Sequence, residues 1–187
     1  MNECSDRVDQ LLSVIFSESF LEGRLSVYPN TLFMFDFSPI ERPHLRWLLS
    51  LLPKQIGDRR VGSIDVFECL RAKIEREGMC DGVQHAAEAE TVTAFIQAAK
   101  FIDSDSLADA ILEEATALES DAVLLSGFGD ISVGWSPSGI LSHLNSRLPE
   151  RTKLVALLPG VVDRGKFRLF DNQERTFPVF RYLRLVQ

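Results

Sequence analysis

The sequence lacks any uninterrupted apolar run near the roughly 20 residues that cross a bilayer, and its first residues are polar and acidic. We therefore expect no membrane span and no secretory leader, and we expect a cytoplasmic protein. Cysteine is also scarce: Cys4, Cys69 and Cys80 are the only three in 187 residues, and they form no CxxC pair. Such an odd, scattered set argues against a disulfide framework and favours reduced thiols.

Histidine is as rare as cysteine. His44, His85 and His143 lie far apart, and no cysteine or carboxylate accompanies them at the spacing of metal ligands. We therefore expect no metal site. Because no complete catalytic set occurs elsewhere either, we expect no cofactor.

Basic residues are in deficit, and the net charge of −7 disfavours general binding to nucleic acid. The charge is uneven, with 11 Lys/Arg against 21 Asp/Glu in residues 1–120 and 9 against 6 in residues 121–187. Residues 81–119 are the extreme, with nine acids and the single base Lys100. They form either a solvated helical face or an acidic surface that steers a basic partner.

The N-terminal part begins with helical spacing of apolar residues from Ser5 to about Leu21. Residues 32–37 are almost wholly apolar, which suits a central strand covered on both faces. Ser38-Pro-Ile-Glu41 has the form of a capping box, so a helix follows there or near Arg42. Asp36 ends the strand, where it either caps a turn or contributes to a ligand site.

The middle of the chain predicts a polar turn at 54–60, a second strand at 61–67 and a short charged helix to Glu77. From residue 84 to 118 the pattern is helical, and Asp103 starts a new helix within it. This segment therefore reads as a helical insertion between strands.

The stretch from Asp121 to Phe170 organises the rest of the chain. It predicts a strand at 122–126, a loop from Gly127 to Gly139, a helix at 140–148 capped by Ser138, a strand at 153–158 and a stop at Pro159-Gly160. This is a βαβ unit, so its strands are parallel. With short strands at 167–170 and 180–186, we predict one three-layer α/β domain (1–187) whose mostly parallel sheet has about five strands, with a helical insertion at about 84–118.

The loop after the first of these strands resembles two catalytic templates without completing either. Gly127-Phe-Gly129 lies where a phosphate-binding loop would, but Ser132 replaces the third glycine and no Gly-Lys-Ser/Thr follows. Around Ser136 a nucleophile elbow fails because Pro137 has no N–H for an oxyanion hole. A degenerate nucleotide-binding or hydrolytic protein that uses the Gly127–Gly139 loop and Asp36 remains the alternative to a binding protein.

The same loop supplies the candidate partner-binding residues Trp135, Phe128 and Asp130. A tryptophan in a polar loop is either tucked over the sheet end or an interface anchor. The basic residues of the C-terminal part alternate with apolar ones, which protects edge strands. Direct DNA contact through these residues is the weakest hypothesis, and we do not expect it.

Four groups of residues in the C-terminal part form a recognisable set: Asp121-Ala-Val-Leu-Leu-Ser-Gly-Phe-Gly129, Leu154-Val-Ala-Leu-Leu-Pro-Gly160, Asp163 with Phe167-Arg-Leu-Phe170, and Phe180-Arg-Tyr-Leu-Arg-Leu185. In these segments the chain resembles the family of BrxB, a small component of the bacterial BREX phage-defence systems. Together they cover about 65 residues at matching spacing, and their motifs are structural rather than catalytic.

The resemblance implies a non-enzymatic adaptor that works in a defence complex with the alkaline-phosphatase-like protein PglZ, an ATPase and a DNA methyltransferase. PglZ is the expected direct partner. The chain departs from the family pattern at Ser136-Pro137-Ser138, where family members tend to carry Arg-Ser-His. No role of that loop is therefore carried over.

Overall fold

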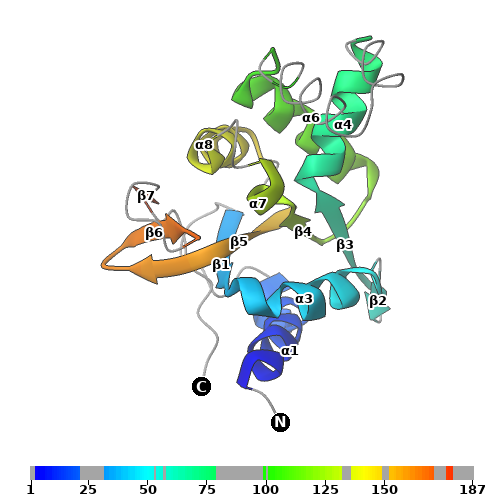
Figure 1. Ribbon diagram of the computed structural model, residues 1–187. Coiled ribbons are helices and arrows are strands. Elements are labelled where there is room, and N and C mark those ends of the chain that lie inside the picture. Colours follow the sequence, from blue (N-terminus) through cyan, green and yellow to red (C-terminus); the bar gives the residue numbers. More distant parts are fainter. Residues whose placement is uncertain are drawn as a thin grey trace.

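The computed structural model describes residues 3–21, 32–52, 54–56, 58–78, 99, 101–131, 136–148, 152–170 and 176–178, and it shows an α/β fold (Figure 1). The main sheet has the strand order β2-β3-β4-β5-β1, in which β2 alone is antiparallel to its neighbour. Its strands are β1 (Leu32–Phe37), β2 (Lys54–Ile56), β3 (Arg59–Asp65), β4 (Ala122–Ser126) and β5 (Lys153–Asp163). The predicted α/β class, with a mostly parallel sheet of about five strands, is confirmed.

Helices cover both faces of this sheet (Figure 1). One face packs against α1 (Glu3–Ile15), α2 (Glu18–Leu21) and α3 (Arg42–Leu49). The other packs against α4 (Val66–Arg76), α6 (Ser104–Ala117), α7 (Phe128–Ile131) and α8 (Pro137–Arg147).

Strand β1 shows how the sequence builds these layers. All six of its residues are buried, as its unbroken apolar run predicts. Because successive side chains of a strand point to opposite faces, Phe33 and Phe35 join the core beneath α1 and α3, whereas Leu32 and Met34 join the core beneath the α4 layer.

The predicted new helix at Asp103 is confirmed, because Asp103 begins α6 by accepting the N–H of Ser106. The predicted strand at 61–67 is too long at its carboxyl end: β3 stops at Asp65, whose side chain accepts the N–H of Phe67 and begins α4 there. The capping box of Ser38 and Glu41 is present in a short 3-10 turn, η1 (Pro39–Glu41), and α3 follows directly from Arg42.

The predicted stop at Pro159-Gly160 is wrong, because β5 runs through it to Asp163. The strand changes partners at this point: Pro159 still pairs with the end of parallel β1, and Gly160 begins the antiparallel pairing with β6 (Lys166–Leu169), which continues to β7 (Thr176–Pro178). A Cβ atom at Gly160 would lie 2.1 Å from the carbonyl oxygen of Arg168. The glycine therefore permits close strand approach rather than a turn.

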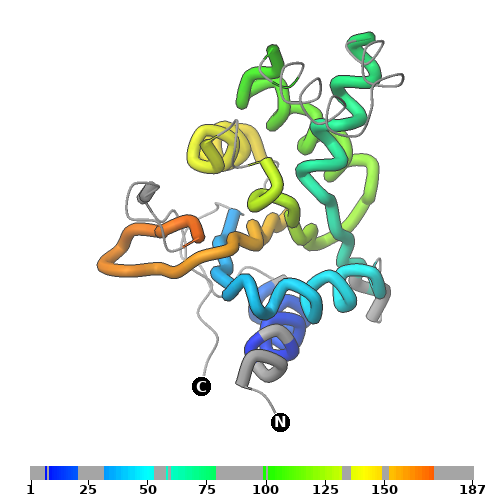
Figure 2. Tube along the Cα trace, viewed as in Figure 1, coloured from blue at the N-terminus to red at the C-terminus, as the bar shows by residue number. Residues whose placement is uncertain are grey.

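Other boundaries also differ. The predicted loop after β4 contains α7, and α8 begins at Pro137 with Ser136 as its first flanking residue, so Ser138 is not the cap. Its hydroxyl instead lies 2.6 Å from that of Ser136. The predicted polar turn at 54–60 contains β2, which pairs with β3. Figure 2 shows in grey the stretches outside the description, which include all of 84–98 and the predicted strand at 180–186.

Candidate functional site

The carboxyl edge of the parallel strands is where an open α/β sheet binds ligands, at the point where successive connections leave toward opposite faces. Here the chain leaves β1 for α3 on one face, and it leaves β3 and β4 for α4 and α7 on the other. This edge therefore holds the first candidate site, and it contains the predicted residues Asp36 and Asp130.

Asp36 lies at the end of β1, as predicted, but it is paired within the chain. Arg7 of α1 donates from Nη2 to its carboxylate at 3.0 Å and to its carbonyl oxygen at 3.1 Å. The other Nη of Arg7 lies 3.8 Å from the buried carboxylate of Glu41, and the guanidinium stands 5.5 Å from the centre of the Phe35 ring. The two carboxylates therefore fasten α1 to the end of β1.

Asp130 is exposed, and it also has partners. Arg42, at the start of α3, donates from Nη2 to both carboxylate oxygens, and Nη2 of Arg46 lies 3.9 Å away. Because α3 and α7 belong to opposite helical layers, this cluster crosses the carboxyl edge of the sheet. One carboxylate serves two guanidinium groups, so the cluster keeps one positive charge.

The glycines after β4 are explained by packing. Gly127 has φ +83°, and a Cβ atom there would lie 2.2 Å from Oδ1 of Asp65, the residue that caps α4. Ser126 donates to the other oxygen of the same carboxylate at 3.3 Å. A Cβ atom on Gly129 would lie 3.0 Å from the Phe170 ring. The Asp65 carboxylate thus already occupies the N-terminus of α4, next to this loop.

Two other residues were predicted to contact a partner. For Phe128 the prediction is wrong, because its side chain is buried, and Trp135 lies outside the described residues. Phe128 is fully buried in the first turn of α7, which packs against α4 and β5. Its side chain fills the core beneath the α4 layer because α7 folds back over the sheet instead of leaving it as an open loop. It presents no surface to a partner.

The exposed apolar surface lies elsewhere, on η1, on α3 and on the turn that follows α3. Among the described residues, five large apolar side chains are exposed, and three belong to this stretch: Ile40 (80%) on η1, Trp47 (57%) on α3 and Leu51 (53%) in the turn after it. They follow one another at spacings of seven and four, which a continuous helix would place on one face. The sequence pattern predicted only the buried face of this helix, with Leu45 and Leu48. The signal for an exposed apolar surface was the presence of further apolar residues, Ile40, Trp47 and Leu51, outside that buried stripe.

Trp47 is held in place by a neighbour on its own helix. The rings of His44 and Trp47 are stacked, with centroids 5.6 Å apart and planes inclined by 28°. Nε2 of His44 lies 3.5 Å from a carboxylate oxygen of Asp9 on α1. The indole therefore stands on a supported surface, which lowers the entropy lost when a partner covers it.

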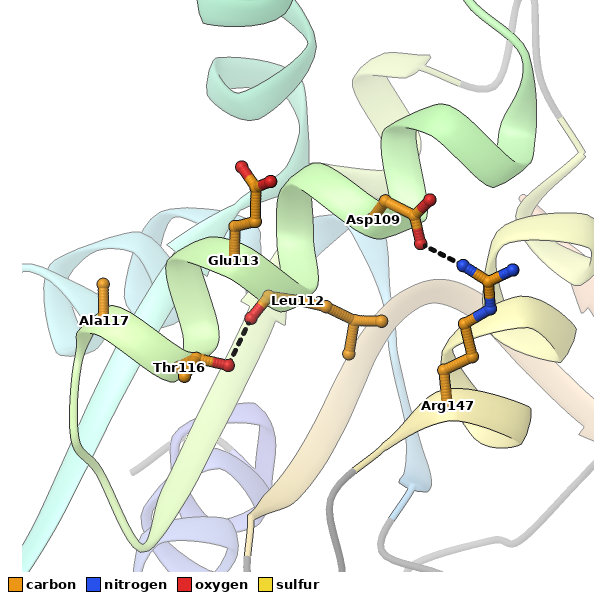
Figure 3. A pocket seen from close by; sticks show the side chains of 6 residues that line it. All are labelled: Asp109, Leu112, Glu113, Thr116, Ala117 and Arg147. Atoms are coloured by element: carbon orange, nitrogen blue, oxygen red, sulfur yellow. Dashed lines mark hydrogen bonds and ion pairs between the residues drawn. The ribbon is translucent and has the colours of Figure 1, made fainter.

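Of the acidic segment 81–119, predicted as a possible contact region, residues 99 and 101–119 are described, and most of them form α6. Figure 3 shows Asp109, Leu112 and Glu113 on this helix beside an open hollow of about 660 Å³, with Arg147 of α8 on its far side. Arg147 donates to Asp109 at 2.8 Å. The hollow thus carries charges of both signs rather than a purely acidic lining.

His143 of α8 closes the α6–α8 contact. Its Nε2 lies 3.0 Å from a carboxylate oxygen of Asp109, and its Nδ1 lies 3.1 Å from one of Asp105. The hydrogen bond to His143 is the main cause that lowers the pKa of the Asp109 carboxyl below its ordinary value of 3.8, and the nearby charge of Arg147 adds to the effect. The two carboxylates lie on different ring nitrogens of His143, so the three side chains do not converge on one point where a metal ion could bind.

We predict that His143→Gln makes stability less dependent on pH in acid. A lowered pKa means that Asp109 stabilises the fold above pH 3.8 and loses this contribution as the pH falls through its folded value. The difference in free energy of unfolding between wild type and variant, measured by urea denaturation from about pH 5 down to pH 2, should therefore shrink. Arg147→Gln, which removes a lesser cause, should show a smaller change. Parallel curves for wild type and His143→Gln would contradict the assignment.

Cys69 is buried between α4 and α6, where it contacts Glu114. Burial raises the pKa of the Cys69 thiol far above its usual range, and so does the hydrogen bond that Cys69 donates to Glu114 at 2.9 Å. This thiol stays protonated at neutral pH and is no nucleophile.

In the described part of the chain no group of three His, Cys, Asp or Glu side chains is arranged to hold a metal, and no helix there has the length and apolarity for a bilayer crossing.

Comparisons with models of protein families, with curated proteins and with solved structures gave no match for this chain.

Proposed function

We propose that this chain is a non-enzymatic adaptor of a BREX-type anti-phage defence complex in the cytoplasm, and that it binds a PglZ-like protein of the alkaline-phosphatase family directly. Other subunits of the complex are its further partners. Its role lies in the burial of protein surface rather than in chemistry.

The resemblance to the BrxB family supports the kind of complex. The described segments that carry it correspond to β4 with the start of α7, to β5 and to β6, and residues 180–185 lie outside the description. Most residues of the described segments are buried, which suits motifs that specify the fold rather than a reaction.

The observation that carries the adaptor role is the apolar face of η1 and α3. The exposed Ile40 on the capped turn η1, Trp47 on α3 and Leu51 just after α3 are costly to leave in water, and such groups of apolar side chains commonly mark binding surfaces. Meanwhile, at the sheet edge, the carboxylates of Asp36, Asp65 and Asp130 already have partners within the chain. The geometry therefore favours a docking surface over a reaction site.

Co-purification tests the proposal. We expect the folded chain and the PglZ-like protein of the same defence system to elute together from a size-exclusion column at micromolar concentrations. An alkaline-phosphatase-fold enzyme from outside any defence system is the matched control and should elute separately. If both proteins are folded and no complex forms, the proposed partner is wrong.

A further inference from the structure

We infer that the η1–α3 face binds an amphipathic helix of the partner whose apolar residues are flanked by carboxylates. The inference rests on the proposed function, since it names the chemistry of the partner at the same surface. This docking face consists of Ile40, Trp47 and Leu51, with Arg42 and Arg46 along one edge.

The apolar part of the docking face fits a helix. Its three side chains lie on η1, on α3 and in the turn after α3, and Pro43, exposed between Ile40 and Trp47, lies on the same stretch. A second helix laid along such a row places its own residues at spacings of three and four between them. Trp47 lies in the middle of the row, where anchors of binding energy are usually found.

The two arginines at the edge of the docking face determine which charge the partner's surface should carry. Arg42 and Arg46 are one turn apart, and they share the single carboxylate of Asp130. The side chain of Arg46 is 68% exposed and its Nη2 lies 3.9 Å from the Asp130 carboxylate, so its charge is available to another molecule. A partner with glutamates or aspartates on this flank gains complementary pairing, and one with lysines is repelled.

The same edge disfavours a second copy of the chain. In an antiparallel pairing of two α3 helices about a two-fold axis, each flank meets its own equivalent, so the arginine edges would face each other. Like charges placed together oppose association. A different molecule with an acidic flank suits the surface better.

A peptide probe tests the inference without the native partner. It is a synthetic helix of about three heptads with leucine at the core positions and glutamate on both flanks. We expect the full chain to bind this peptide in calorimetry at least about tenfold more tightly than the same peptide with lysine flanks. Trp47→Ala should weaken binding at least about tenfold, and Leu51→Ala is a second variant should the first fail to fold. Phe101→Ala, an exposed aromatic on the opposite helical layer, should leave binding unchanged.

Three outcomes would overturn the inference: no binding of the glutamate peptide, equal or tighter binding of the lysine peptide, or a wild-type dimer in sedimentation that Trp47→Ala dissociates. The proposed function is tested separately by the PglZ-like protein. If that protein binds wild type and both docking-face variants equally, the adaptor role stands and this inference falls. If the peptide pattern holds but the PglZ-like protein does not bind, the surface chemistry stands and the proposed partner falls.

Discussion

Phe128→Ala is expected to lower the free energy of unfolding by about 3–5 kcal/mol. The ring is fully buried among the side chains of the α4 layer, and α7 is too short to be stable without it. Removing the ring leaves a cavity between α4 and β5 that these elements cannot close without shifting. Urea denaturation followed by far-ultraviolet circular dichroism measures the loss.

Phe101→Ala is the matched control, because it makes the same chemical change at a side chain that is 79% exposed. Its effect should stay within about 0.5 kcal/mol. The outcome that contradicts a core role would be a Phe128→Ala protein as stable as wild type that no longer binds its partner. That result would restore the surface role first predicted for this residue.

The error over Phe128 shows what a sequence pattern can and cannot settle. Strands such as β1 and β4 are predicted correctly because their apolar runs are local, and the helix start at Asp103 is predicted from a single capping side chain. A phenylalanine between two glycines has no such local signature. Its burial depends on a four-residue helix that folds back over the sheet, which is a tertiary event.

Pro159-Gly160 fails for a related reason. Both residues are local breakers, yet β5 continues because β1 pairs with one side of the break and β6 with the other. The strand partners come from distant parts of the chain, so no window around residue 160 contains the information.

The candidate site divides in the same way. The places of Asp36 and Asp130 at the carboxyl edge follow from the order of strands and helices, which the sequence indicates. Their partners do not: Arg7 is 29 residues from Asp36, and Arg42 is 88 residues from Asp130. Only the three-dimensional pairing shows that these acids are neutralised within the chain. It also shows that the exposed apolar surface lies on η1 and α3 instead.

Gly127→Ala is expected to lower the free energy of unfolding by about 2–3 kcal/mol, of which about 1–2 kcal/mol comes from the left-handed backbone and about 1 kcal/mol from a weakened cap. Gly127 has φ +83°, and the new Cβ atom would lie 2.2 Å from Oδ1 of Asp65. The carboxylate must then move, and α4 loses the acceptor for its first N–H groups.

Gly78→Ala separates the two costs, because Gly78 has φ +69° and a Cβ atom there would meet nothing within 4 Å. It should cost only the conformational share, about 1–2 kcal/mol, and the extra loss at Gly127 is then the cost of displacing Asp65. Both losses, measured by urea denaturation, should be the same with and without millimolar ATP or GTP, since Gly127 packs against the Asp65 carboxylate, and a negative charge beside the loop disfavours a phosphate. A Gly127→Ala protein that keeps its stability but loses a stabilisation by nucleotide shown by wild type would instead favour a nucleotide-binding loop.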